Sequence, residues 1–153
     1  FMMQSSIKKE ALTQIENSHN PVKVFVAPTM KFHVWRVAIQ TDKHDYVGTA
    51  RWKDVEFTDK VKRQAMTPDS LLWKVKGNKD IFTFLNFSSI YRWQTTPLED
   101  GTTEIRLMDL RYLNNGRYSF VAIAHLTHVN EIDHSYIGWV FSEDKLQRKL
   151  FSQ

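Results

Sequence analysis

The spacing of apolar side chains changes three times along the chain and divides it into four stretches. Apolar residues recur at helical spacing, then alternate with polar residues, return to helical spacing in the middle and finally form strands again. We expect one soluble domain over residues 1–153. It contains an N-terminal helix in 1–20, a β-meander in 21–57, a helical segment in 58–90 and a β-rich half in 91–153.

The first two stretches have recognisable ends. Residues 5–18 predict a helix that Ser5 or Ser6 caps. Its apolar stripe consists of Ile7, Ala11, Leu12 and Ile15. In the meander, residues 34–41 and 46–52 predict a hairpin, because alternation of apolar and polar residues is typical of half-buried strands. The residues expected to face inward in its first arm are Trp35, Val37 and Ile39.

The second half predicts two short helices followed by strands. Pro68 suits the first turn of one helix, and residues 80–87 predict another whose apolar residues nearly all face inward. Residues 114–116 read Asn-Asn-Gly, a strong hairpin signal, and 118–127 are apolar enough for a central strand. A final helical turn is expected in 145–151. The fold class is therefore α+β, with a curved antiparallel sheet of about six to seven strands packed by the N-terminal helix and the central pair.

Composition narrows the class of protein. Aromatic residues make up 13% of the chain, so we expect no extensive disorder. The sequence contains no Cys, which excludes disulfides, thiolate nucleophiles and Cys-based zinc sites. The net charge of +4 comes from scattered basic residues, so we expect no nucleic-acid partner. A mild basic excess also suits a domain beside an anionic membrane leaflet.

Asp109 and Arg111 are the strongest candidates for a polar site. If residues 104–112 form one strand, both side chains share a face with Ile105 and Leu107. Opposite charges on an apolar face predict a buried pair, because an isolated buried charge is costly. The pair can be structural or can hold a ligand, and the structural interpretation is favoured.

The other candidate chemistry is weaker. His125, His128 and His134 are close in sequence, but the odd separation of the first two puts them on opposite faces of a strand, so we expect no metal site and no cofactor in this chain. No nucleophile elbow or phosphate-binding loop motif is present, and we expect no catalytic residue. Five aromatic residues can line an apolar groove, although a core role is favoured: Trp35, Trp52, Phe84, Phe87 and Tyr112.

Several segments together resemble a known family. Trp35-Arg36-Val37 and Tyr46-Val47-Gly48 are similar to the opening of its soluble domain, Phe84-Leu85-Asn86-Phe87-Ser88 resembles its FLxFS segment, and Asp109-Leu110-Arg111-Tyr112 resembles its DxRY strand. The family is the YfhP/YdjM type, described as membrane-bound metal-dependent hydrolases. Ser89-Ile90-Tyr91 departs from the Arg-Phe-Pro that often follows the FLxFS segment.

The resemblance implies a membrane-bound parent protein whose metal-ligating histidines lie in an N-terminal membrane part. The start at Phe1 rather than Met favours a piece of such a parent. We then expect a non-catalytic accessory domain on the cytoplasmic side, with the membrane portion of the same polypeptide or another protein as partner. Alternatively, the domain binds a small ligand or completes an active site, at a polar site formed by Asp109 and Arg111 with Trp35 and Arg36 as further motif residues. An exposed apolar patch near the N-terminal helix would favour the first interpretation. A concave pocket containing both charged groups would favour the second.

Overall fold

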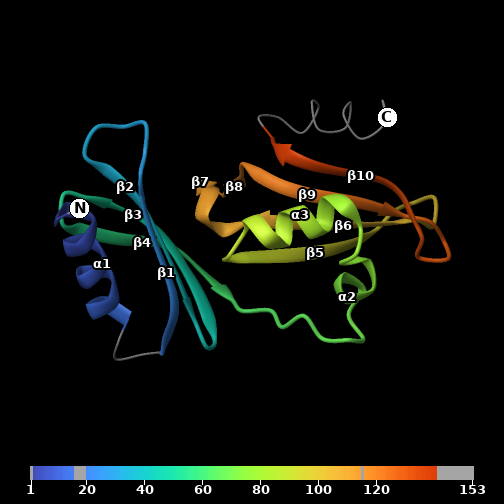
Figure 1. Cartoon of the computed structure of the whole chain (residues 1–153), viewed down its shortest axis with the longest axis horizontal. Coiled ribbons are helices and arrows are strands. Elements are labelled where there is room, and N and C mark those ends of the chain that lie inside the picture. Colours follow the sequence, from blue (N-terminus) through green and yellow to red (C-terminus); the bar gives the residue numbers. More distant parts are fainter. Residues whose placement is uncertain (1, 16–19, 115, 141–153) are drawn as a thin grey trace. The chain divides into compact units, whose positions relative to one another are not determined.

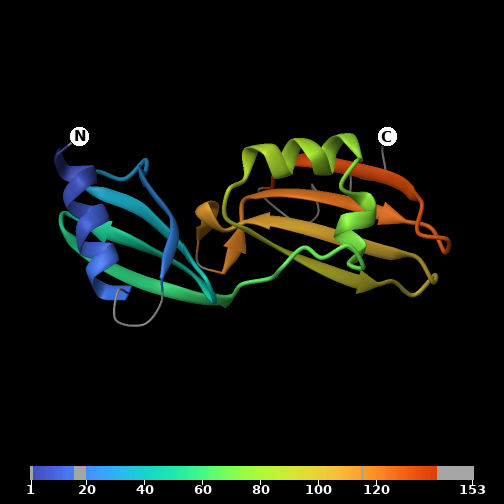
Figure 2. The same cartoon turned by 60° about the horizontal axis from the view of Figure 1, so that its bottom comes forward.

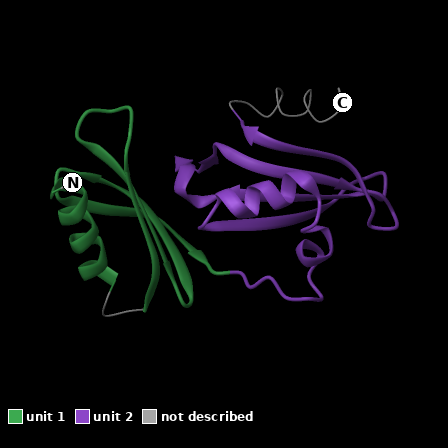
Figure 3. Cartoon of the chain, viewed as in Figure 1, with its two compact units in different colours: residues 1–63 green, residues 64–153 purple. Residues whose placement is uncertain are grey.

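The computed structural model describes residues 2–15, 20–114 and 116–140. The chain divides into two compact units, residues 1–63 and 64–153 (Figure 3). This boundary lies six residues beyond the end of the predicted meander. The division into compact units does not test whether the chain folds as one domain, and that expectation stays a prediction.

The first unit is a four-stranded antiparallel sheet with one helix (Figure 1). Its elements are α1 (Met2–Ile15), β1 (Pro21–Pro28), β2 (Val34–Thr41), β3 (His44–Arg51) and β4 (Asp54–Lys62), and the strands lie in sequence order. The predicted stripe of the helix meets the sheet, since Ile7, Ala11 and Ile15 pack with Val37 and Ile39. A β-meander under one helix is therefore the fold of this unit.

Two details of this unit differ from the sequence prediction. The helix begins at Met2, so Ser5 and Ser6 lie inside it and do not cap it. In the second half of β2 both faces are buried, because Ala38 and Gln40 are covered as well as Ile39. The first arm of the hairpin is thus more deeply buried than simple alternation indicates.

The second unit places a four-stranded antiparallel sheet, in the order β10-β9-β6-β5, beside two helices and a two-stranded ribbon. Its elements are α2 (Leu71–Val75), α3 (Lys79–Phe87), β5 (Tyr91–Pro97), β6 (Thr103–Asp109), the 3₁₀ turn η1 (Leu110–Tyr112), β7 (Leu113–Asn114), β8 (Arg117–Tyr118), β9 (Phe120–Leu126) and β10 (Ile132–Trp139). Helix α3 runs across one face of the sheet (Figure 2). Its buried Phe84 packs with Leu107 and Ala122 from that face.

A polar side chain caps the start of each helix in this unit. Ser70 caps α2, and its hydroxyl accepts a hydrogen bond from the Trp73 amide. Because the helix begins at Leu71, Pro68 precedes it and does not lie in its first turn as predicted. Asn78 caps α3 by accepting from two backbone amides. The expectation that the apolar residues of the second helix nearly all face inward was wrong for Phe82 and Phe87, which are 57% and 49% exposed.

The strand predicted over residues 104–112 ends at Asp109. The Asp109 carboxylate accepts a hydrogen bond from the Arg111 amide and so caps η1. Arg111 therefore reaches Asp109 from a tight turn and not from the next position on one strand face. The hairpin signal at 114–116 was correct, because Leu113–Asn114 pairs with Arg117–Tyr118 and Gly116 has a φ of +73°.

The α+β class with antiparallel sheets is confirmed. The strands form two four-stranded sheets and a ribbon, where the sequence predicted one sheet of about six to seven strands. Strand β9 is an inner strand with both faces buried, as its composition indicated. The helical turn expected in 145–151 lies outside the described residues. Among the described helices, none combines the length and apolar character needed to cross a membrane.

Candidate functional site

Asp109 and Arg111 form a close ion pair. The Nη2 atom of Arg111 lies 2.7 Å from Oδ2 of Asp109, and Nε also donates to the carboxylate. The Asp109 side chain is fully buried and that of Arg111 is 11% exposed. The pair is therefore largely removed from water. Further hydrogen bonds from the protein are then needed to offset the cost of desolvating both charges.

Those hydrogen bonds come from the surrounding fold. The Ser88 hydroxyl donates to Oδ2 of Asp109 at 2.7 Å, and Nη2 of Arg111 donates to the Phe87 carbonyl oxygen at 2.9 Å. Burial alone lowers the pKa of the Arg111 guanidinium, but the hydrogen bonds and charge of Asp109 outweigh burial and raise that pKa. The pair thus ties η1 to the end of α3. These contacts support a structural role, while ligand binding stays an untested prediction.

Trp35 and Arg36, the other two predicted site residues, belong to the first unit, whereas Asp109 and Arg111 belong to the second. Both are partly buried on β2, where Arg36 is opposite Thr49 and Trp35 is opposite Ala50. Trp35 lines a groove of about 480 Å³ formed by Met3 and residues 28–35.

The same end of the first unit carries an exposed apolar surface. We name Met30, Phe32 and Trp52 the apolar tip; they are 104%, 85% and 52% exposed. Met30 and Phe32 come from the β1–β2 loop and Trp52 from the β3–β4 turn. Of the five aromatic residues weighed for a groove, Phe84 is buried core, whereas Trp52 and Phe87 are exposed. The sequence did not predict the apolar tip, because Met30 and Phe32 fall between the predicted strands.

Local contacts order the backbone of the apolar tip. Thr29 accepts a hydrogen bond from the Lys31 amide at 3.1 Å, and its own amide donates to the Val34 carbonyl. The rings of His33 and Trp52 stack with centroids 3.8 Å apart. Both residues have φ near +60°, which is uncommon for side chains of this size. The exposed residues thus project from a defined turn.

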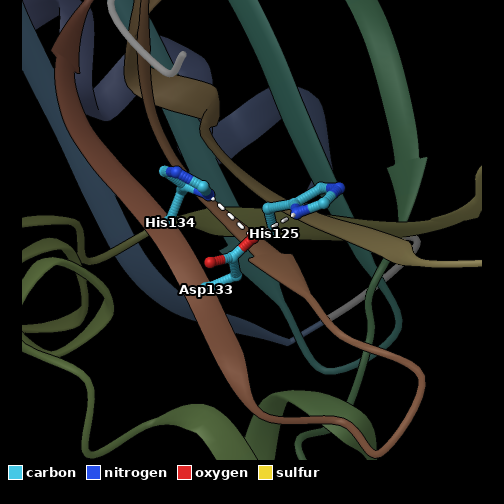
Figure 4. A group of neighbouring side chains, drawn as sticks. All are labelled: His125, Asp133 and His134. Atoms are coloured by element: carbon cyan, nitrogen blue, oxygen red, sulfur yellow. Dashed lines mark ion pairs between the residues drawn. The ribbon is translucent and has the colours of Figure 1, made fainter. Parts of the chain in front are cut away.

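A third group lies on the second sheet, where His125, Asp133 and His134 converge (Figure 4). Oδ2 of Asp133 is 3.0 Å from Nδ1 of His134 and 3.7 Å from Nδ1 of His125. One potential ligand atom from each residue lies within 4.8 Å of the other two. These residue types can hold a divalent transition metal.

A β-bulge explains why the spacing argument missed this group. The pairing of β9 with β10 shifts between Ile132 and His134, so Asp133 is the extra residue and His134 lies opposite His125. A bulge allows two successive side chains to approach the same face, which regular alternation forbids. His128, the third histidine of this part of the sequence, approaches the Gly101 carbonyl and does not belong to the group. The spacing argument compared His125 with His128 and did not consider the approach of His134 to His125 across the strand pair. The expectation that this chain binds no metal stays a prediction.

The sequence of the chain matches two family models and one curated protein. Residues 70–150 match the YfhP C-terminal alpha/beta plait domain, and residues 19–61 match the YfhP middle domain. The chain is 39% identical over 151 residues to the uncharacterized protein YfhP of Bacillus subtilis (strain 168). That match covers 98% of this chain but 45% of the relative. No solved structure matches the chain. The matched C-terminal domain alone covers more than half of the sequence, and the chain therefore belongs to the YfhP family.

Proposed function

We propose that this chain is a non-catalytic, water-facing part of a longer membrane-bound protein and that it docks on the bilayer surface through the apolar tip. The exposure of Met30, Phe32 and Trp52 beside the N-terminal helix is the observation that carries the proposal. An exposed apolar patch is typical of an interaction surface. The B. subtilis relative is more than twice as long as the matched region, which leaves room for a membrane portion elsewhere.

The residues around the apolar tip favour a lipid surface as the partner. Lys31 lies between Met30 and Phe32, and Arg51 and Lys53 flank Trp52. All three cations are exposed, although the acidic Asp54 follows Lys53. Aromatic residues beside cations suit the interface of an anionic membrane, where the rings enter the headgroup region and the cations meet lipid phosphates. This charge pattern favours the cytoplasmic leaflet, and we propose that side for the chain.

We also propose that metal-dependent hydrolase chemistry, implied by the resemblance to the YfhP/YdjM type, resides in the part of the longer protein outside this chain. Two observations support this: the resemblance itself, and the hydrogen bonds that the Asp109–Arg111 pair already makes within the protein. A carboxylate and guanidinium already bonded to Ser88 and Phe87 suit a structural role better than substrate binding. The accessory function therefore rests on the apolar tip and not on this pair.

Sedimentation with lipid vesicles tests the docking proposal. The wild-type chain should bind phosphatidylcholine vesicles that contain about one-third phosphatidylglycerol, and should bind pure phosphatidylcholine more weakly. Replacing Met30 and Phe32 together by Ser should weaken binding at least about tenfold, because both apolar contacts are lost.

The matched control replaces two exposed apolar residues of the second unit, Phe82→Ser and Val129→Ser, which are 57% and 72% exposed in the wild type. This variant should bind as the wild type does. Equal binding by the tip variant and the control variant would contradict the proposal. Failure of the wild type to bind either kind of vesicle would also contradict it and would direct attention to a protein partner.

A further inference from the structure

We propose that His125, Asp133 and His134 form a binding site for a divalent transition metal ion of the zinc class. The site lies on strands β9 and β10 of the second unit. It is independent of the proposed membrane docking, which rests on residues of the first unit. A metal site also goes beyond an accessory role, because it gives the second unit a ligand of its own.

The distances between the three side chains fit a metal ion. Zinc binds imidazole nitrogen and carboxylate oxygen at 2.0–2.2 Å, so two ligand atoms at a tetrahedral site are about 3.3 Å apart. The Asp133 oxygen is 3.0 Å from one imidazole nitrogen and 3.7 Å from the other. One ligand atom from each of the three residues lies within 4.8 Å of the other two. Small side-chain rotations are sufficient to bring them onto one ion.

A supporting shell orients His125. Its Nε2 atom lies 3.0 Å from Oγ1 of Thr102, and the Thr102 hydroxyl donates to the Asp100 carboxylate. A hydroxyl has a single proton to donate, so Thr102 accepts from His125 and the Nε2 atom carries hydrogen. Histidine ligands in metal sites are held in this way, with the ring nitrogen that does not bind metal donating to a neighbour.

This tautomer determines what His125 offers to the cluster. With hydrogen on Nε2 of the neutral ring, Nδ1 has a lone pair, and it faces the carboxylate oxygen of Asp133 (Figure 4). Two electron-rich atoms facing each other are stabilised by a cation between them. An ion pair between His125 and Asp133 is the alternative account of the same geometry. The experiment must therefore separate a metal site from a simple ion pair.

The chemistry of the ligands selects the class of ion. Imidazole suits zinc, copper, iron and nickel, whereas magnesium and calcium prefer oxygen ligands throughout. Three protein ligands leave at least one coordination position for water or another molecule. Asp133 and His134 have side chains 47% and 30% exposed, so an ion can reach them from solvent. We expect an open surface site that prefers zinc to magnesium.

Titration of the whole chain, prepared without a polyhistidine tag, tests the site. Calorimetry should give one zinc ion per chain, and cobalt should give the intense visible absorption of four-coordinate N/O ligation. His134→Gln should weaken zinc binding more than about tenfold, and Thr102→Val should weaken it by about 10- to 100-fold through loss of orientation. The matched control is His128→Gln, which removes an exposed histidine that contacts the Gly101 carbonyl and lies outside the group of three.

The outcomes are distinct. One-to-one binding that survives His128→Gln and is lost in His134→Gln supports the site. Zinc binding that is absent, or that falls equally in both variants, overturns it and leaves an ion pair of His125 and His134 with Asp133. Vesicle binding should be the same for His134→Gln and the wild type, so failure here is distinguishable from failure of the docking proposal.

Discussion

Arg111 contacts Asp109 through both its Nε and Nη2 atoms while the Arg111 backbone amide donates to the same carboxylate. One aspartate thus caps η1 and neutralises the guanidinium. Loss of either partner leaves a buried charge, so Asp109→Ala or Arg111→Ala should each reduce the free energy of unfolding by about 3 to 5 kcal/mol. The double variant should lose less than the sum of the two.

Urea unfolding of the wild type, the two single variants and the double variant measures the coupling energy between Asp109 and Arg111. Arg106→Ala is a comparison variant: the side chains of its ion pair with Glu104 are 24% and 17% exposed, so this pair is less buried than Asp109–Arg111 and its loss should cost less. A coupling energy near zero between Asp109 and Arg111, with wild-type midpoints, would contradict the structural role.

Gly48 has a packing reason for its place in β3. A Cβ at this position would lie 2.0 Å from the Glu56 carbonyl oxygen on β4, where the pairing of the two strands shifts register. Gly48→Ala should therefore cost more than about 3 kcal/mol of unfolding free energy, because backbone and not a flexible side chain must move. Gly77→Ala meets no atom within 4 Å and should change stability by less than about 0.5 kcal/mol. Equal unfolding midpoints for the two variants would show that the β4 backbone moves aside at little cost and would contradict this prediction.

Asp45 predicts a pH dependence of stability. Its side chain is 1% exposed, and burial raises its pKa to about 6 from 3.8, against the opposing effects of Arg63, Gln40 and Lys23. Between these values the folded protein keeps a proton that the unfolded chain has lost. The free energy of unfolding contributed by this group therefore falls as pH rises from about 4 to about 6 and stays lower above that range.

Asp45→Asn removes this titration and should stabilise the protein at pH 7 by about 1 to 2 kcal/mol, because a buried carboxylate no longer has to ionise. The gain should vanish near pH 4. Asp69→Asn, at a fully exposed aspartate, should leave the pH dependence in place. Unfolding midpoints are measured at several pH values. A constant difference between Asp45→Asn and the wild type from about pH 4 to about pH 7 would show that Asp45 is not the cause of the pH dependence.

The prediction of a single domain can be tested by unfolding. If residues 1–63 and 64–153 fold as one cooperative domain, both units unfold in a single transition. Gly48→Ala and Asp109→Ala, in different units, should each shift the tryptophan fluorescence and circular dichroism transitions together. Two separated transitions, each sensitive to one variant, would show independent domains.

Sequence patterns predicted most elements because their apolar periodicity is strong. The stripe of Ile7, Ala11 and Ile15 and the two-sided burial of β9 are examples. Burial of Asp109 beside Arg111 also followed from the cost of an isolated charge, although the turn that joins them did not. The turn depends on a side chain that caps its own backbone, a contact that periodicity does not encode.

The remaining features depend on irregular backbone. The bulge at Asp133 brings His134 to the side of His125, and a single sequence gives no local signal for that shift. The apolar tip is likewise defined by exposure, since Met30 and Phe32 look like ordinary core residues until the loop that carries them is known. Assignment of strands to two sheets requires long-range pairing that alternation alone does not determine.

The most direct test of docking uses the absence of native Cys. Lys31→Cys and Lys79→Cys each replace an exposed lysine, one between the tip residues Met30 and Phe32 and one on α3. Each variant is labelled with a fluorophore sensitive to polarity and mixed with anionic vesicles. We predict a blue shift and quenching by brominated lipid for the label at position 31 and no change at position 79. Equal responses at the two positions, or none at position 31 while the protein is vesicle-bound, would contradict docking through the apolar tip.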